Sequence, residues 1–177
     1  MDLDHTKYAK LEDFLNDSYF RDFSGSIKIH DIQKKFLTYI TSRDVMCYKK
    51  QMRCSGTSTI LRYIAIWNLV FNNRSVAYCN SNFNRCMENT KAITKILRSL
   101  FDESILEKLI QKVAWGNVDV LNNKLISSTS PYRLNINTSR RNAVLIIDED
   151  DTFKAIGVCL RLNPVLFEYH QSIVIIS

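Results

Sequence analysis

The sequence predicts an α/β fold in which helices flank a mostly parallel sheet. Apolar runs at residues 75–80, 143–150 and 172–177 are typical of strands that are buried on both faces, as in a covered parallel sheet. Segments whose apolar residues recur at helical spacing lie between the expected strands. The 177 residues include only 4 Gly and 2 Pro, which indicates short connections and mostly regular structure.

The first half of the chain carries two amphipathic segments, a strand and a strongly apolar helix. A helix is expected over residues 5–20, because the following apolar residues recur at roughly helical spacing: Tyr8, Leu11, Phe14, Leu15 and Tyr19. A second helix is expected over residues 29–40 and a strand over residues 44–51. The helix expected over residues 58–72 is apolar nearly all round, so it should be buried on two sides.

The second half begins with helices and changes to short β-rich runs. A helix is expected over residues 84–101, with these side chains facing inward: Met87, Ala92, Ile93, Ile96, Leu97 and Leu100. Another helix is expected over residues 103–113. Runs around the Asn122–Lys124 turn are typical of a hairpin followed by a further strand. A partly helical stretch over residues 154–169 precedes the last strand.

Composition limits the class of protein. Lys and Arg number 24 against 18 Asp and Glu, and the resulting net charge of +6 favours either a polyanionic partner or simply a solvated basic surface. Five cysteines without a CxxC pair and three scattered histidines predict neither a zinc site nor a disulfide framework. The polar N-terminus is unlike a signal peptide, and the apolar run Tyr63–Phe71 is about half a membrane span. We therefore expect a soluble intracellular protein with no membrane partner.

Residues 51–60, QMRCSGTSTI, nearly form a phosphate-binding loop between a strand and a helix. A P-loop follows its last glycine with lysine and then serine or threonine, whereas here Gly56 is followed by Thr57 and Ser58. Backbone N–H groups at the helix N-terminus would face an anion, and Gly56 would let the backbone approach it. Ser58 occupies the position at which a P-loop supplies a magnesium ligand. The alternative interpretation is a chance run of small polar residues before a helix.

A pair of acids ends the apolar strand AVLIIDED. Asp148 and Glu149 follow four apolar residues, as in the Walker B motif, where the first acid holds hydrated Mg²⁺ and the second acts on the attacking water. The alternative is a buried strand that runs into a solvated acidic turn, because Asp150 and Asp151 extend the acidic run.

With these motifs in order, the sequence resembles the N-terminal ATPase domain of phage large terminases, the motors that drive DNA into viral capsids. The resemblance covers most of the chain from about residue 29 and includes HDIQKKFLTYI, KKQMRCSGTST, SVAYCNSNFNRC, WGNVDVLNNKL, VLIIDED and SIVIIS. It implies an N-terminal helical extension over residues 1–28. It also implies a P-loop ATPase-like (terminase/helicase-like) core over residues 29–177, ending at the strand that carries the coupling motif.

The resemblance implies ATP and Mg²⁺ as cofactors. The residues that would hold the nucleotide are Gln33, Lys50, Ser55, Gly56, Thr57 and Ser58. Ser58 and Asp148 would hold the metal, whereas Glu149 and Arg53 would be catalytic, with Arg53 as a charge-stabilising finger. Thr57 cannot supply the charge of the missing lysine, and losing one charge-assisted contact costs about 1.5–3 kcal/mol. In some terminases a lysine near the start of the loop substitutes, which Lys49 or Lys50 could do here.

Two main functions remain open from the sequence. The first is an ATP-dependent DNA-packaging or translocation ATPase, or a relative with weak or lost hydrolysis. Its expected partners are double-stranded DNA and other phage packaging proteins, with an oligomer forming on assembly. The second is a non-catalytic phage protein that keeps the fold and binds a host protein, a viral protein or DNA. A helicase-like fragment shares the motifs, but no second motor domain is evident. The cytoplasm of the host cell is the expected location.

Overall fold

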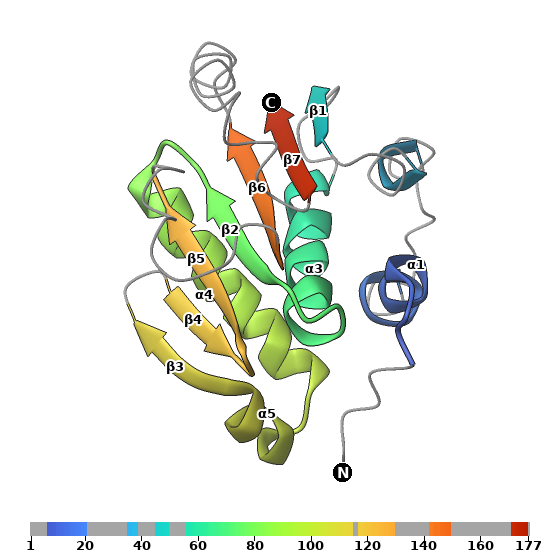
Figure 1. Ribbon diagram of the computed structural model, residues 1–177, viewed down its shortest axis with the longest axis vertical. Helices are drawn as coiled ribbons and strands as arrows, with labels where there is room; N and C mark the ends of the chain where they lie inside the picture. Colours follow the sequence, from blue (N-terminus) through green and yellow to red (C-terminus); the bar gives the residue numbers. More distant parts are fainter. Residues whose placement is uncertain are drawn as a thin grey trace.

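The strands form one seven-stranded sheet in the order β1-β7-β6-β2-β5-β4-β3 (Figure 1). In this computed structural model the described residues are 7–20, 35–38, 45–49, 56–114, 117–129, 142–149 and 171–176. The strands are β1 (Val45–Lys49), β2 (Ser75–Cys79), β3 (Ile110–Ala114), β4 (Asn117–Val120), β5 (Asn123–Ser128), β6 (Ala143–Glu149) and β7 (Gln171–Ile176). The helices with assigned bounds among the described residues are α1 (Leu11–Leu15), the π-helical turn η1 (Asn16–Phe20), α3 (Thr57–Val70), α4 (Phe83–Leu100) and α5 (Glu103–Leu109). Residues 35–38, within the helix predicted over residues 29–40, are also helical.

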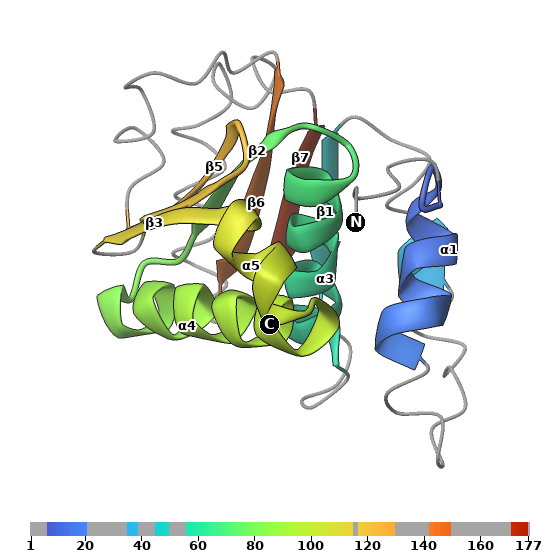
Figure 2. The same ribbon diagram turned by 90° about the horizontal axis from the view of Figure 1, so that it is seen from below.

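The sheet is mostly parallel, as predicted. The five strands from β1 to β5 in the sheet order run parallel, while β4 and β3 add an antiparallel extension at one edge. Parallel strands require crossover connections, and α3 lies in the connection between β1 and β2, which β7 and β6 separate in the sheet. Figure 2 shows α3 and α4 on the same face of the sheet. The predicted α/β architecture with flanking helices is confirmed.

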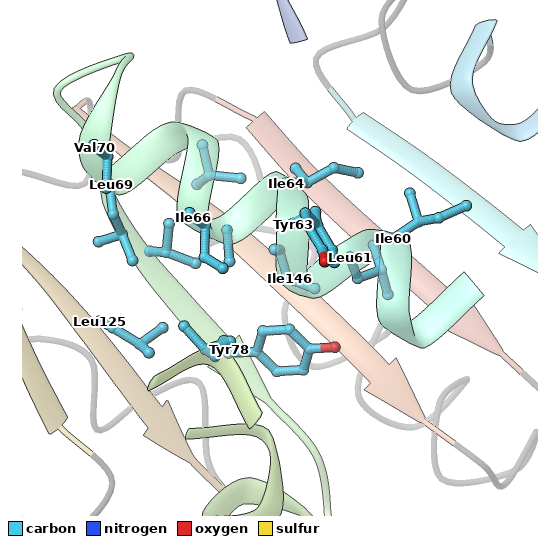
Figure 3. Close-up of a cluster of buried hydrophobic side chains, with 14 of the residues drawn as sticks. Ile60, Leu61, Tyr63, Ile64, Ile66, Leu69, Val70, Tyr78, Leu125 and Ile146 are labelled. Atoms are coloured by element: carbon cyan, nitrogen blue, oxygen red, sulfur yellow. The ribbon is translucent and has the colours of Figure 1, made fainter. Parts of the chain in front are cut away.

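Helix α3 is the centre of the core and is buried on two sides. Its inner side chains, including Ile66 and Leu69, are almost fully buried and lie toward Tyr78 and Leu125 of the sheet (Figure 3). Its outer side receives the N-terminal segment. The prediction of a helix apolar nearly all round and buried on two sides is therefore confirmed.

Aromatic side chains fasten the N-terminal segment to α3. The ring of Phe14 lies 6.2 Å from that of Tyr63 and 5.3 Å from that of Phe71, between ring centroids. The indole Nε1–H of Trp67 donates to the carbonyl oxygen of Tyr8 over 2.9 Å. These contacts give residues 7–20 a place in the core, whereas the predicted domain boundary at residue 28 stays a prediction.

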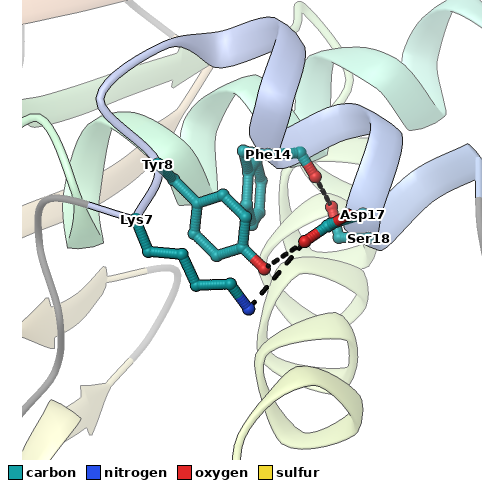
Figure 4. Close-up of polar contacts among 5 residues, drawn as sticks. All are labelled: Lys7, Tyr8, Phe14, Asp17 and Ser18. Carbon is teal, nitrogen blue, oxygen red and sulfur yellow. Dashed lines mark hydrogen bonds and ion pairs between the residues drawn. The ribbon is translucent and has the colours of Figure 1, made fainter.

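A small polar cluster fixes the shape of this segment (Figure 4). The hydroxyl of Tyr8 donates to Asp17 Oδ2 over 3.1 Å, and the ammonium of Lys7 lies 3.8 Å from the same oxygen. The hydroxyl of Ser18 donates to the carbonyl oxygen of Phe14 one turn earlier. Within the helix predicted over residues 5–20, the described residues 7–20 form a turn followed by α1 and η1.

The helix predicted over residues 103–113 is wrong in its second half. Helix α5 ends at Leu109, and Ile110–Ala114 form strand β3, which pairs with β4. The Leu121 N–H donates to the Leu109 carbonyl over 2.8 Å. The Leu109 carbonyl, which would accept the next hydrogen bond of a longer helix, is therefore occupied by a partner from the hairpin. Pairing with β4 overrides the local helical spacing. The hairpin itself, β4 and β5 joined through Leu121 and Asn122, is confirmed.

The buried side of α4 also differs from the prediction. The buried residues are Cys86, Asn89, Thr90, Ile93 and Leu97, so the prediction is confirmed for Ile93 and Leu97. The other four predicted residues, Met87, Ala92, Ile96 and Leu100, are half-buried, and Ile96 and Leu100 pack against the core. Two of the buried residues are polar. Thr90 donates to the hydroxyl of Ser127 over 2.7 Å, and Asn89 accepts from Arg62, so partners on neighbouring elements offset the cost of burial.

Among the described residues, no helix is long and apolar enough to cross a membrane.

Candidate functional site

The two sequence motifs leave the sheet at the same edge. Strand β7 lies between β1 and β6, and both Lys49 and Glu149 are register partners of Ile176. Parallel neighbours are about 4.8 Å apart, so the backbones of Lys49 and Glu149 are separated by about 10 Å. In the sequence, residues 50–55 connect the end of β1 to Gly56 and α3. Ligands of open α/β sheets bind outside the carboxyl ends of the strands, where these motifs lie.

Gly56 begins the helical side of the site. Its backbone is left-handed, with φ 74° and ψ 2°, and its carbonyl accepts the first helical hydrogen bond, from the Ile60 N–H over 2.9 Å. Helix α3 therefore starts at Thr57, where a P-loop carries its lysine. Thr57 is buried and Ser58 is half-buried. The first turn directs N–H groups and the positive end of the helix dipole out of the helix.

We expect Gly56→Ala to destabilise the protein by about 1–2 kcal/mol, because a Cβ atom disfavours the left-handed conformation by this amount. Urea denaturation of the full chain measures the change. An unfolding midpoint equal to that of the wild type would contradict a left-handed backbone at this position.

The acid pair is buried at the end of β6. Asp148 is 6% exposed and Glu149 is 3% exposed. Neither carboxylate therefore belongs to a solvated acidic turn, the alternative that the sequence left open, whereas Asp150 and Asp151 lie outside the described residues. Burial of a carboxylate costs free energy unless hydrogen bonds or cations offset that cost. The hydrogen-bond partners of Asp148 and Glu149 provide this compensation.

Asp148 is held by the carboxyl end of the neighbouring strand β2. The phenol of Tyr78 donates to Asp148 Oδ2 over 3.2 Å, and the side-chain amide of Asn80 donates to the Asp148 carbonyl. Burial raises the pKa of Tyr78 well above its ordinary value, with the nearby Asp148 carboxylate adding to the rise. The phenol accordingly stays protonated and remains a donor.

Glu149 is held by the next residue along the same segment. The backbone N–H of Ser81 donates to Glu149 Oε2 over 2.9 Å, and its hydroxyl donates to Oε1 over 3.0 Å. Both oxygens of one buried carboxylate thus accept hydrogen bonds from a single residue. Two bonds to different oxygens of the same carboxylate fix the orientation of the side chain.

Arg62 on α3 carries a positive charge near Tyr78, the partner of Asp148. Ser58 and Arg62 are four residues apart and share a helix face. Arg62 donates through Nε and Nη2 to Asn89 Oδ1 over 3.0 and 2.8 Å, and its positive charge acts to lower the pKa of Tyr78. Arg62 thus brings positive charge near the phenol that contacts Asp148.

The donor set suits a magnesium ion only when phosphates complete it. Ser58 and Asp148 offer one hydroxyl and one carboxylate, the oxygen ligands that Mg²⁺ prefers. No group of three or more His, Cys, Asp or Glu side chains gathers for a metal in the described part of the chain. Magnesium commonly binds through one or two protein ligands, substrate phosphates and water. The residues present fit a metal–nucleotide complex better than a metal alone.

The described residues cover only part of the predicted site. Gly56, Thr57, Ser58, Asp148 and Glu149 are described, whereas Gln33, Lys50, Arg53 and Ser55 lie outside the described residues. Three residues that contact the acid pair were not predicted from the sequence, namely Tyr78, Asn80 and Ser81. The sequence indicates these residues only weakly, through the polar residues that end the apolar strand SVAYCNS.

The fold has a counterpart among solved structures. One solved structure that shares it is the large terminase of bacteriophage HK97, with a TM-score of 0.60 at 14% sequence identity over 85% of this chain. The chain spans 33% of the length of that terminase. No protein-family model and no curated protein matches the sequence. At this identity the similarity shows the fold alone.

Proposed function

We propose that this domain binds ATP together with Mg²⁺ and serves as a terminase-like ATPase module in DNA packaging. The observation that supports the proposal is the shared register of Lys49 and Glu149 on Ile176: β1, which precedes Gly56 in the sequence, and β6, which carries the acid pair, end at one edge of the sheet. The TM-score of 0.60 to a phage large terminase supports the same class. Double-stranded DNA and other packaging proteins are the proposed partners.

Each described residue of the site has a proposed role. The N–H groups at Gly56–Ser58 bind phosphate oxygens, and the Ser58 hydroxyl and the Asp148 carboxylate hold the metal. Bound Mg²⁺ would neutralise phosphate charge. Glu149 takes a proton from a water molecule whose oxygen bonds to the γ-phosphorus, while the bond to the β–γ bridging oxygen breaks and ADP keeps its electron pair.

The cation of the site is proposed to come from the loop before Gly56. Thr57 has no charge, and the positively charged Lys50 and Arg53 stand in the sequence shortly before the glycine. In the proposed site these two side chains replace the missing lysine at the phosphates, and Ser55 adds a further polar contact. Gln33 is the proposed adenine contact, by resemblance to the terminase segment.

Magnesium-dependent nucleotide binding tests this function. Asp148→Asn is expected to weaken binding of a fluorescent ATP analogue in the presence of Mg²⁺ by about 10-fold to 100-fold, since the charged contact is lost. Binding without Mg²⁺ should not change. Asp119→Asn, on the antiparallel extension, is the matched control. A folded wild-type protein that binds no nucleotide with Mg²⁺ would refute the proposal.

A second function is favoured by one observation. Thr57 stands where the phosphate-binding lysine belongs, and a protein that has lost hydrolysis can keep the fold as a binding surface. In that case the domain binds a viral protein, a host protein or DNA without turnover. Specific capture of one partner, undisturbed by Asp148→Asn, would favour this function over the first.

A further inference from the structure

We propose that residues 78–81, the end of β2 and the connection to α4, form a positioning element for the acid pair. In this element Tyr78 orients the carboxylate of Asp148, and Ser81 orients that of Glu149. The proposal rests on the proposed function, because it concerns the carboxylates of the same site, but it assigns roles to residues that touch neither nucleotide nor metal.

The hydroxyl of Tyr78 is explained by Asp148 rather than by packing. Tyr78 is 0% exposed and lies among apolar side chains between the sheet and α3 (Figure 3). A phenylalanine would fill the same space without burying a polar group, which has a cost when unpaired. The hydroxyl finds its partner in Asp148 Oδ2 over 3.2 Å. This bond limits rotation of the carboxylate, as hydrogen bonds to metal ligands generally do.

Ser81 restricts Glu149 more completely. The backbone N–H and the hydroxyl of Ser81 reach different oxygens of the carboxylate, so both its position and its plane are set. A glutamate side chain otherwise has considerable rotamer freedom, and fixing it costs conformational entropy. Because these bonds hold before any ligand arrives, a water molecule would meet a carboxylate already oriented.

Asn80 and Asn82 give this element its rigidity. The Asn80 side chain donates to the Asp148 carbonyl, and its Oδ1 accepts from the Asn82 N–H over 2.8 Å. Asn82 in turn caps α4, since its side chain accepts from the Asn84 N–H over 2.9 Å. The end of β2 is therefore anchored to β6 on one side and to the start of α4 on the other.

Tyr78→Phe tests the first half of the proposal through binding alone. The Mg²⁺ concentration that gives half-maximal binding of a fluorescent ATP analogue should rise about 10-fold, a typical effect of removing a partner of a metal ligand. Tyr63→Phe removes a buried hydroxyl from α3, on the side that faces Phe14, and should change nothing. Thermal unfolding checks that both variants fold. An unchanged magnesium dependence in folded Tyr78→Phe would overturn this half.

Ser81→Ala tests the second half. Its kcat should fall about 10-fold with KM unchanged, because binding is intact while the base is poorly oriented. Ser81→Thr keeps the hydroxyl and should restore kcat. An unchanged or increased kcat in Ser81→Ala, or a wild type without turnover, would overturn this half. If the folded wild type shows no magnesium-dependent nucleotide binding, the proposed function itself is refuted.

Discussion

Glu149→Gln is expected to reduce ATP turnover by about 100-fold to 10,000-fold while leaving magnesium-dependent nucleotide binding intact. The substitution keeps the size of the side chain but removes its ability to take a proton, which contributes a factor of this order in general base catalysis. Glu149 is 3% exposed and both its carboxylate oxygens accept hydrogen bonds from Ser81. The substituted side chain is therefore held in place and cannot restore the lost proton transfer by changing its rotamer. Release of inorganic phosphate, measured at saturating ATP, gives the change in kcat.

The matched control for this prediction is Glu107→Gln. Glu107 is an exposed residue of α5, so this substitution makes the same chemical change at a position away from the acid pair. It should turn over ATP like the wild type. If Glu149→Gln retains full turnover, Glu149 is not the base. If neither the wild type nor the variant turns over ATP, the non-catalytic function is favoured.

Phe14→Ala is expected to destabilise the protein by about 3–5 kcal/mol, the usual cost of deleting a buried phenyl ring. Phe14 is 2% exposed and packs against Tyr8, Tyr63 and Phe71, with ring centroids 5.5, 6.2 and 5.3 Å away. The truncation would leave a cavity between α1 and the outer side of α3. Urea denaturation of the full chain, followed by circular dichroism, measures the lost free energy of unfolding.

Phe83→Ala provides the comparison for this loss. Phe83 is 59% exposed at the start of α4, and substitutions at such positions usually change stability by less than about 0.5 kcal/mol. A similarly small loss in Phe14→Ala would contradict the packing of the N-terminal segment as part of the core. In that case residues 7–20 would not belong to the cooperative folding unit.

The parts of the fold that the sequence predicted well are those set by local pattern. The apolar run 143–147 predicts a strand that is buried on both faces, and β6 is buried along its whole length. The nearly uniform apolarity of α3 likewise predicted burial on two sides. Both signals depend on side chains that lie next to one another in the chain, which a single sequence shows directly.

The parts that escaped prediction depend on partners far away in the sequence. Ile110–Ala114 form a strand only because β4 is available to pair with them. Likewise, Tyr78 and Ser81 reach the acid pair across 70 and 68 positions of chain, so no local pattern marks them. From the sequence alone, a polar residue such as Asn89 would be expected on the solvent-facing side of its helix. In the structure it is buried and accepts hydrogen bonds from Arg62. Such long-range contacts are a property of the folded chain.

The central claim is that the N-terminus of α3 and the acid pair of β6 face one metal–nucleotide site. The most direct test maps backbone amide chemical shifts by NMR as a non-hydrolysable ATP analogue and Mg²⁺ are added. We predict that the amides of Gly56, Thr57 and Ser58 shift together with those of Asp148 and Glu149, with a single affinity, and that Asp148→Asn weakens all of these shifts. Shifts confined to only one of the two groups, or to neither, would contradict the account.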